Sequence, residues 1–532
     1  NHARQVQKMR GNVVKTYFFL TFALRKQVPL SLWLSQSLET THPKCGSSSV
    51  GRALASPAKG RGFEPRLPLF LYFYMGAIII SIILIGLFLI ATESLNRMNK
   101  AAVAMFFGVS CWLLYIAFGS DFVISQHPVQ FFSYISSHAI NAMAVKDFIA
   151  HNIFTEYIFR GAQVVLYFLA TMTIVEVLNN NGCFDFIGEW LRSKRPITLL
   201  WVLAIITFLL SANLDNTTTA CLMLGIMHPV FQDERMRKIY GAVIILAANC
   251  GGASTVIGDL TTLTLWTDGL ITPTAYSMMV MPALVVALGT TLTLISLRLP
   301  ARIHLGTHIP PYRGDDTILN RWQRMIMFFV GAGGLWFIPT FHRITQLPPF
   351  LGAMCVLSLL WIVNELCNRS LLGSDQMVRK RLPLALQYVN IQNLLFFIGL
   401  TLMFGAATET GLLQKGFTWL ASAGDSMAYG VGIAGGLLSG VLGNVTTLLG
   451  LTAFFEQPNL AAVANPAHFW PLLSYTTAVG GSLLATGTIT GLVLMRMENV
   501  SLKWYATHVM PKVFAGWLAG LAVLFVMMYF WN

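Results

Sequence analysis

Charged side chains are scarce in this sequence: Asp, Glu, Lys and Arg make up 11% of the 532 residues, whereas 55% of the residues are hydrophobic. Soluble domains carry about 25% charged residues, so the composition argues against a soluble enzyme. Cysteine is scarce as well, and the seven cysteines show neither a CxxC pair nor another metal-ligand spacing. No disulfide framework, zinc site or other cofactor site is therefore predicted. This composition is typical of an all-α polytopic membrane protein, and the lipid bilayer is its expected surroundings.

Acidic residues are outnumbered by basic ones, and the formal net charge is +13. The first 67 residues hold 11 Lys and Arg against 2 Asp and Glu, so most of the excess lies ahead of the hydrophobic body and no nucleic-acid partner is predicted. We interpret residues 1–68 as a non-native or targeting extension. The run Gly62 to Pro65 resembles a translated tRNA gene and favours a start near Met75, whereas the low acid content leaves a transit peptide open.

Two apolar runs in residues 196–238 are too short to cross a membrane. The first, Pro196 to Leu210, would span roughly 22 Å as a helix, whereas the hydrocarbon core is about 30 Å thick. Basic residues flank both outer ends of the pair, and such residues favour cytoplasmic loops. We therefore expect a re-entrant helical hairpin that enters from the cytoplasm and has a polar tip, Ser211 to Thr219, near the middle of the membrane.

The tip of this hairpin carries a carboxylate, Asp215. Irregular backbone at membrane depth is tolerated only inside protein or beside a wet cavity, and an acid there is a functional-site hypothesis. A helix N-cap role for Asp215 is compatible with this hypothesis. The following segment, 239–272, breaks at Gly251 and Gly252 and resumes near Asp259, which predicts a discontinuous helix.

The second half of the chain repeats this pattern. Shifted by about 228 positions, the hairpin tip corresponds to Asn444, Thr446 and Thr447, and the helix break corresponds to Gly480 and Gly481. The mouths of this second hairpin hold one basic residue, Lys415, so it is expected to open to the outside. We therefore predict two inverted repeats, each with a re-entrant hairpin and a broken transmembrane helix, which is typical of secondary transporters.

These features define a predicted domain organisation. After the extension at 1–68, the first transmembrane half comprises residues 69–300, with its hairpin at 196–238 and its broken helix at 239–272. Residues 301–383 form a linking loop with connecting helices. The second, inverted half comprises residues 384–532, with its hairpin at 427–456 and its broken helix at 468–496.

The polar residues of the tips and breaks form one predicted site for cation and proton. Their oxygens suit a small alkali cation such as Na⁺. Buried acids close together hold either protons or a cation, so Asp215 and Asp259 would exchange one for the other. Glu176 is a candidate for proton access, or else an interfacial acid. An external loop is predicted from Ser120 to Arg160, and we interpret its histidines, His127, His138 and His151, as solvated. The full predicted set is Asp215, Asn216, Thr217, Thr218, Asn249, Ser254, Asp259, Asn444, Thr446, Thr447, Ser482, Thr486 and Thr488.

Five motifs in this sequence resemble those of the NhaD-type sodium/proton antiporters of the ion transporter superfamily. They are Thr171-Met-Thr-Ile-Val-Glu176, Asp215-Asn216-Thr-Thr-Thr, the run Asn249 to Thr262, the run Gly480 to Gly487, and Met497-Glu498-Asn-Val-Ser-Leu-Lys-Trp-Tyr. The resemblance extends from about Met75 to the end. It implies export of Na⁺ or Li⁺ in exchange for H⁺, an inverted-repeat fold and, by superfamily analogy, a homodimer with an elevator-like transport domain. At the second tip, Gly443 and Thr446 replace the acid and proline usual in the family, so the number of bound cations stays open.

Three other interpretations compete with the antiporter. A superfamily relative that moves carboxylates or arsenite is the nearest, although two acids in the site would repel a dianion. An intramembrane aspartyl protease would use Asp215 and Asp259 but leaves the repeat unexplained, so we expect no enzyme. A scaffold without transport activity is the third. The expected location is a prokaryotic inner membrane, with a plastid envelope as the alternative if the N-terminal extension is real.

Overall fold

The structure is a computed structural model that describes residues 66–136, 142–191, 195–300, 319–369, 390–422, 426–457, 460–462 and 464–530. The predicted extension at 1–68 lies almost wholly outside the described residues. Within them the chain forms helices and no β-strand. The prediction of an all-α fold is therefore confirmed.

The first group of helices leads from the N-terminal side into the long helix α9. Its members are α3 (Arg66–Ala91), α4 (Glu93–Asn96), α5 (Lys100–Ala117), α6 (Gly119–Gln126), α7 (Pro128–Ile135), α8 (Ala142–Phe148), the π-helical segment η2 (Ile149–Phe154), α9 (Thr155–Asn180) and α10 (Asp185–Trp190). The sequence pattern predicts a loop from Ser120 to Arg160. The structure instead places short helices there, because aromatic side chains such as Phe131 and Phe148 pack on one another and bury this segment.

The next two groups contain the first hairpin, the first broken helix and the connecting helices. They are α11 (Pro196–Ser211), α12 (Asn216–Met227), α13 (Glu234–Ala253), α14 (Leu260–Thr267), α15 (Pro273–Ser296), α16 (Arg321–Phe328), the π-helical η3 (Phe329–Gly333), α17 (Ile338–Thr345) and α18 (Pro349–Cys367).

The last group contains the second hairpin and the second broken helix. It comprises α21 (Ile391–Glu409), α22 (Leu412–Ser422), α23 (Ser426–Leu442), α24 (Asn444–Phe455), the 3₁₀ turn η5 (Leu460–Ala462), α25 (Pro466–Gly481), the 3₁₀ turn η6 (Ala485–Gly487), α26 (Ile489–Met497), α27 (Leu502–His508) and α28 (Met510–Phe530).

Seven helices of the described part are long and apolar enough to cross a membrane, or eight if the bent pair formed by Arg321–Gly333 and Ile338–Thr345 is one span. The chain is a multi-pass integral membrane protein. Helices α11, α12, α23 and α24 are apolar too, but they have only 16, 12, 17 and 12 residues. At about 1.5 Å per residue, none of the four reaches across a hydrocarbon core of about 30 Å.

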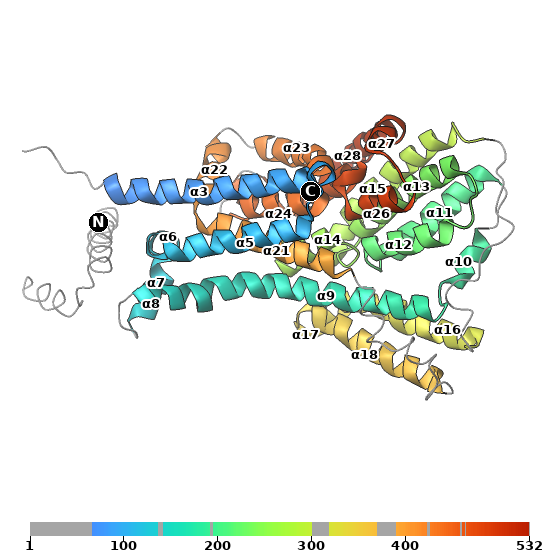
Figure 1. Cartoon of the computed structure of the whole chain (residues 1–532), viewed down its shortest axis with the longest axis horizontal. Helices are drawn as coiled ribbons and strands as arrows, with labels where there is room; N and C mark the ends of the chain where they lie inside the picture. The colour runs from blue at the N-terminus through green and yellow to red at the C-terminus, as the bar shows by residue number, and fades with distance from the viewer. Residues whose placement is uncertain are drawn as a thin grey trace, which may run out of the picture.

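The two hairpins lie on opposite sides of a shared centre. In Figure 1 the green helices α11 and α12 lie toward one end of the molecule, and the orange helices α22, α23 and α24 lie toward the other, beside α3. Helix α21 packs against α3, α5 and α9, and it also contacts α24. Helix α14 contacts α24, and α12 contacts α26, so each hairpin meets the broken helix of the other half.

Each hairpin packs on the broken helix of its own half through the same kind of contact. The hydroxyl of Ser211 donates to the carbonyl of Ala248 at 2.6 Å, and the hydroxyl of Ser439 donates to that of Thr477 at 2.7 Å. Beside these bonds, a Cβ added to Gly251 would overlap the backbone of Phe208, and one added to Gly480 would overlap that of Gly436. The glycines at both breaks therefore allow backbone to touch backbone.

The two tips differ in how their second helix begins. Asp215 caps α12, because its carboxylate accepts a hydrogen bond from the backbone N–H of Thr218 at 2.7 Å. At the corresponding position before α24 stands Gly443, which has φ +100° and supplies no side-chain cap. A residue with a side chain would be strained in this conformation, so glycine fits the second tip for a backbone reason.

Candidate functional site

Asp259 lies between the tips of the two hairpins. It immediately precedes α14, and its side chain is buried, with 1% of the residue exposed. The carboxylate accepts three hydrogen bonds, from Asn216 Nδ2 at 3.0 Å, Thr261 Oγ1 at 2.7 Å and Asn444 Nδ2 at 3.4 Å. The two asparagines begin α12 and α24, so the tips of both hairpins donate to one acid.

Asp215 is also buried, and it lies one residue before Asn216, which bonds Asp259. One carboxylate oxygen, Oδ2, accepts from the backbone and the hydroxyl of Thr218, both at 2.7 Å. The other oxygen, Oδ1, has no hydrogen-bond partner among the described residues. The carboxylates of Asp215 and Asp259 repel each other electrostatically when both are ionised. The capping role of Asp215 therefore leaves one oxygen of a buried acid available to a ligand.

A second polar chain joins the two broken helices. Asn249 donates to the hydroxyl of Ser482 at 2.8 Å and accepts from Thr490 at 3.1 Å, and Thr490 in turn contacts Thr488 at 2.8 Å. All four residues are buried. Ser254, which was predicted to face the centre, instead donates to the carbonyl of Gly251 at 2.6 Å. Its hydroxyl thus satisfies the end of its own helix.

The second tip carries hydroxyls without partners. Thr446 Oγ1 and Thr447 Oγ1 are buried and have no hydrogen-bond partner among the described residues. Thr446 lines a cavity of about 30 Å³, whose wall also includes Thr486, Glu93 and Lys100. A cavity needs about 10–15 Å³ to hold one water, so this one has room for an ion or two waters. Buried oxygens without partners are costly unless a ligand or water satisfies them.

Two further predicted residues lie beside the acids without bonding Asp259. Thr217 donates to the amide oxygen of Asn216 at 3.2 Å and so helps to orient that amide. Glu176 is half-buried in α9, and its charge and that of Asp215 both act on Cys221. Glu176 thus lies in the electrostatic neighbourhood of the first tip.

Two residues of this site are absent from the predicted set. Thr261 bonds the carboxylate of Asp259, and Thr490 bonds the amide of Asn249. The spacing offered a signal for Thr261, because a hydroxyl two residues after an acid that precedes a helix is in reach of that acid. No comparable local signal exists for Thr490, which lies 241 positions from its partner.

A polar cluster at the C-terminal end of α21, which ends at Glu409, is also absent from the prediction. Glu409 is buried and accepts from Tyr157 at 2.9 Å and from Tyr115 at 3.3 Å, and it bonds His127 Nε2 at 2.7 Å. The hydrogen bond with Glu409 raises the pKa of His127 above its ordinary value. The interpretation of His127 as a solvated residue is therefore wrong. Of the other loop histidines, His138 lies outside the described residues.

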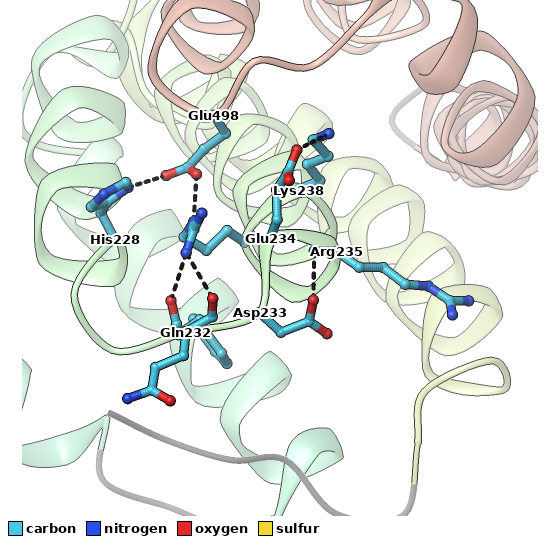
Figure 2. A network of polar contacts seen from close by, with 9 residues as sticks. His228, Gln232, Asp233, Glu234, Arg235, Lys238 and Glu498 are labelled. Atoms are coloured by element: carbon cyan, nitrogen blue, oxygen red, sulfur yellow. Dashed lines mark hydrogen bonds and ion pairs between the residues drawn. The ribbon is translucent and has the colours of Figure 1, made fainter. Parts of the chain in front are cut away.

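A charged network ties the first hairpin to the second broken helix (Figure 2). Glu498 follows α26, and its buried carboxylate bonds His228 Nδ1 at 2.7 Å and Arg237 Nε at 2.9 Å. Arg237 also donates to the carbonyls of Phe231 and Gln232, both at 3.1 Å. This network fixes the loop between α12 and α13 against the end of α26.

The fold and this buried centre define a class of protein: a polytopic membrane protein with interrupted helices and buried acids beside the interruptions, which is typical of secondary transporters. The sequence model of the family described as CitMHS, citrate transporter, matches residues 87–372. This match covers more than half of the chain, and the chain belongs to that family.

Curated relatives confirm the resemblance to NhaD-type antiporters. A protein of Arabidopsis thaliana named sodium/proton antiporter 2 is 29% identical over 444 residues, which are 82% of this chain and 96% of the relative. Sodium/proton antiporter 1 of the same plant is 31% identical over 368 residues, 68% of this chain and 61% of the relative. The Na⁺/H⁺ antiporter NhaD of Alkalimonas amylolytica is 27% identical over 402 residues, 70% of this chain and 78% of the relative.

Among solved structures, the YdaH transporter of Alcanivorax borkumensis is similar in fold. Its TM-score is 0.53 at 14% sequence identity, and the match covers 80% of this chain and 98% of that chain. At this identity the likeness supports the fold and no more.

Proposed function

We propose that this protein exchanges Na⁺ or Li⁺ for H⁺ across a membrane, with cation and proton competing for Asp259 and Asp215. The observation that carries the proposal is that Asp259, a buried acid, receives an amide donor from each hairpin tip. An ionised carboxylate attracts a small cation, and a protonated one does not. Movement of either tip would change the hydrogen bonds to Asp259. Binding of a cation or a proton at Asp259 would therefore be linked to the opening of a path to one side of the membrane.

The unpartnered oxygens support an alkali cation as substrate. Asp215 Oδ1, Thr446 Oγ1 and Thr447 Oγ1 are hard ligands, suited to Na⁺ or Li⁺. The names of the Arabidopsis and NhaD relatives point to the same reaction. The remaining predicted residues, Asn249 with Ser482 and Thr217 with Asn216, would hold the ligand-bearing segments in place.

The name of the family favours citrate as a second candidate substrate. The charges at the site argue against it, because two buried acids repel a citrate anion. Lys100 is the basic side chain that lines the small cavity at the second tip, and Glu93 on the same wall balances it. The same repulsion applies to other carboxylates, while arsenite stays a candidate for the transport assay. Since the named relatives are transporters, we propose that the chain is not an enzyme, a protease included.

We further propose the inverted-repeat organisation. Its first half would comprise residues 69–300 and its second half residues 384–532, with 301–383 as the link. The repeated contacts at Ser211 and Ser439 support this division. A homodimer is proposed by superfamily analogy, and light scattering of the purified protein tests it.

The proposed location is a prokaryotic inner membrane. The Arabidopsis relatives are 29% and 31% identical, against 27% for the Alkalimonas NhaD, which makes a plant organelle envelope the alternative. Microscopy of the full chain fused to a fluorescent protein, in bacterial and plant cells, distinguishes the two.

Dye-monitored proton movement in everted vesicles tests the function. Addition of Na⁺ or Li⁺ should release protons from the vesicle lumen, whereas K⁺, citrate and arsenite should not. Asp259→Asn and Asp215→Asn should each abolish the response. Asp233→Asn is the matched control, because this exposed residue caps α13 and asparagine caps equally well. A response to citrate alone, or full activity in Asp259→Asn, would contradict the proposal.

A further inference from the structure

A second cavity, distinct from the one at the tip of α24, lies among α9, α14, α21 and α24. Its volume is about 190 Å³, and its polar lining includes Arg160, Thr264, Asp268, Thr452 and Glu456. One water needs about 10–15 Å³, so the cavity accommodates a cation together with a hydration shell.

The walls of this cavity lead toward the buried acid. Helix α14 begins directly after Asp259 and ends before Asp268, while α24 begins at Asn444 and ends before Glu456. Thr264 lies five residues beyond Asp259, which is about 7–8 Å along the helix. The cavity therefore extends from the far ends of α14 and α24 to within about two turns of the site.

One basic and two acidic side chains share the rim. Arg160 Nη1 bonds Glu456 Oε1 at 3.1 Å, and Arg160 Nη2 bonds Glu156 on its own helix at 2.9 Å. Asp268 interacts electrostatically with both Arg160 and Glu456. When Asp268 is ionised, two carboxylates against one guanidinium leave the lining with a net negative charge, which favours cations over anions.

An independent observation points to a ligand in this cavity. Thr452 is 4% exposed, and its hydroxyl has no hydrogen-bond partner among the described residues. It lies on α24 one turn before Glu456, on the same cavity wall. A buried hydroxyl beside two carboxylates is an oxygen set suited to an alkali cation with some of its waters.

We propose that this cavity is a second cation-binding site, formed by Asp268, Glu456 and Thr452, and that Arg160 acts as a tethered competitor for it. In the described arrangement the guanidinium holds Glu456. A cation that reaches the cavity must displace Arg160 from Glu456, and when the cation leaves, the ion pair forms again. Arg160 thereby lowers the affinity of the site and favours release of the ion, which on the proposed function is the exported Na⁺.

Thiol protection measures occupancy of this site without relying on transport. Ala453→Cys, which lines the cavity without being one of the proposed ligands, is placed in a background with Cys221, Cys355 and Cys367 changed to serine, since these three are at least partly exposed. A membrane-impermeant cationic methanethiosulfonate reagent is applied to right-side-out and everted vesicles, in NaCl or in choline chloride of equal ionic strength. Labelling is expected from the outer side, and Na⁺ should slow it several-fold. Thr408→Cys, which also lines the cavity, replaces the first probe if Ala453→Cys does not fold.

Three rim variants give the decisive comparison. Arg160→Gln should lower the Na⁺ concentration for half-protection by up to about fivefold, in line with an ion pair that is partly exposed and contributes about 0.2–1 kcal/mol. Asp268→Asn and Glu456→Gln should raise it. Arg235→Gln is the matched control, because the side chain of Arg235 is exposed and points away from the Glu498 network in Figure 2.

The outcomes separate this proposal from the proposed function. Equal labelling in Na⁺ and choline, or the same half-protection in Arg160→Gln as in Arg235→Gln, overturns the second site even if exchange is intact. Protection by Na⁺ that persists in vesicles without Na⁺/H⁺ exchange supports the second site and contradicts the exchanger. Protection by citrate instead of Na⁺ overturns both.

Discussion

Replacement of Thr261 by valine tests whether Asp259 holds the exchanged proton. The hydroxyl of Thr261 donates to Asp259 Oδ2 at 2.7 Å, and the residue is 1% exposed, so no water replaces the lost donor at once. A hydrogen bond to a charged group contributes about 1.5–3 kcal/mol. This bond stabilises the ionised carboxylate more than the protonated one. Its loss therefore favours proton binding over Na⁺ binding.

The magnitude follows from the value of this bond. One pH unit corresponds to about 1.36 kcal/mol, so the midpoint of transport activity should move by about 1–2 pH units to the alkaline side. Below the midpoint, the Na⁺ concentration for half-maximal response should rise about tenfold for every pH unit that the midpoint moves. Initial rates of proton release in everted vesicles, measured across a pH series at several Na⁺ concentrations, give both quantities.

The neighbouring residue provides a matched control. Thr262 is equally buried, but its hydroxyl donates to the main-chain carbonyl of Asp259, at 3.0 Å, and not to the carboxylate. Thr262→Val should therefore keep the parental midpoint. If Thr261→Val also keeps that midpoint, or if both variants change it alike, proton binding does not take place at Asp259.

Two further predictions concern stability. Glu498→Gln removes the charge that binds Arg237. Because water reaches part of this pair, the free energy of unfolding should fall by about 2 kcal/mol, which is measured as a lower Tm in detergent. The control is Glu365→Gln at an exposed residue, which should leave Tm unchanged. The pKa of His127 is raised by its bond to Glu409, so its contribution is complete below the unfolded value of about 6.5 and is lost as pH rises through the higher folded value. The difference in unfolding free energy between the parent and His127→Gln should accordingly shrink with rising pH; a difference that grows would contradict this assignment.

Local breaks in apolar runs were readable in the sequence. A polar segment such as Ser211 to Thr219 inside a hydrophobic stretch cannot continue through lipid, so the end of α11 and the start of α12 were predictable. The paired glycines at 251 and 252 indicated a break as well, although α13 continues through them and ends at Ala253. Both glycines lie at close contacts: Gly251 meets the backbone of Phe208 in α11, and Gly252 meets the backbone of Gly258 and the side chain of Asn216.

Contacts between residues far apart in the sequence could not be predicted from the sequence. Glu409 lies 282 positions from His127, and no local pattern indicates that an acid ending one helix meets a histidine between two others. The short helices between 119 and 148 were missed for a related reason. Their aromatic residues show no clear helical period in the sequence. These helices are held in place by contacts between rings from different helices, such as those of Phe131 and Tyr134 with Phe148.

The direct contact of Gly251 with the backbone of Phe208 has a mechanical consequence. Two helices whose backbones touch have no flexible side-chain layer between them, so they resist sliding against each other. We therefore expect α11 and α13 to move together. A movement that opens a path to either face of the membrane is therefore expected at interfaces formed by long side chains, such as the one where Arg160 of α9 contacts Glu456 after α24.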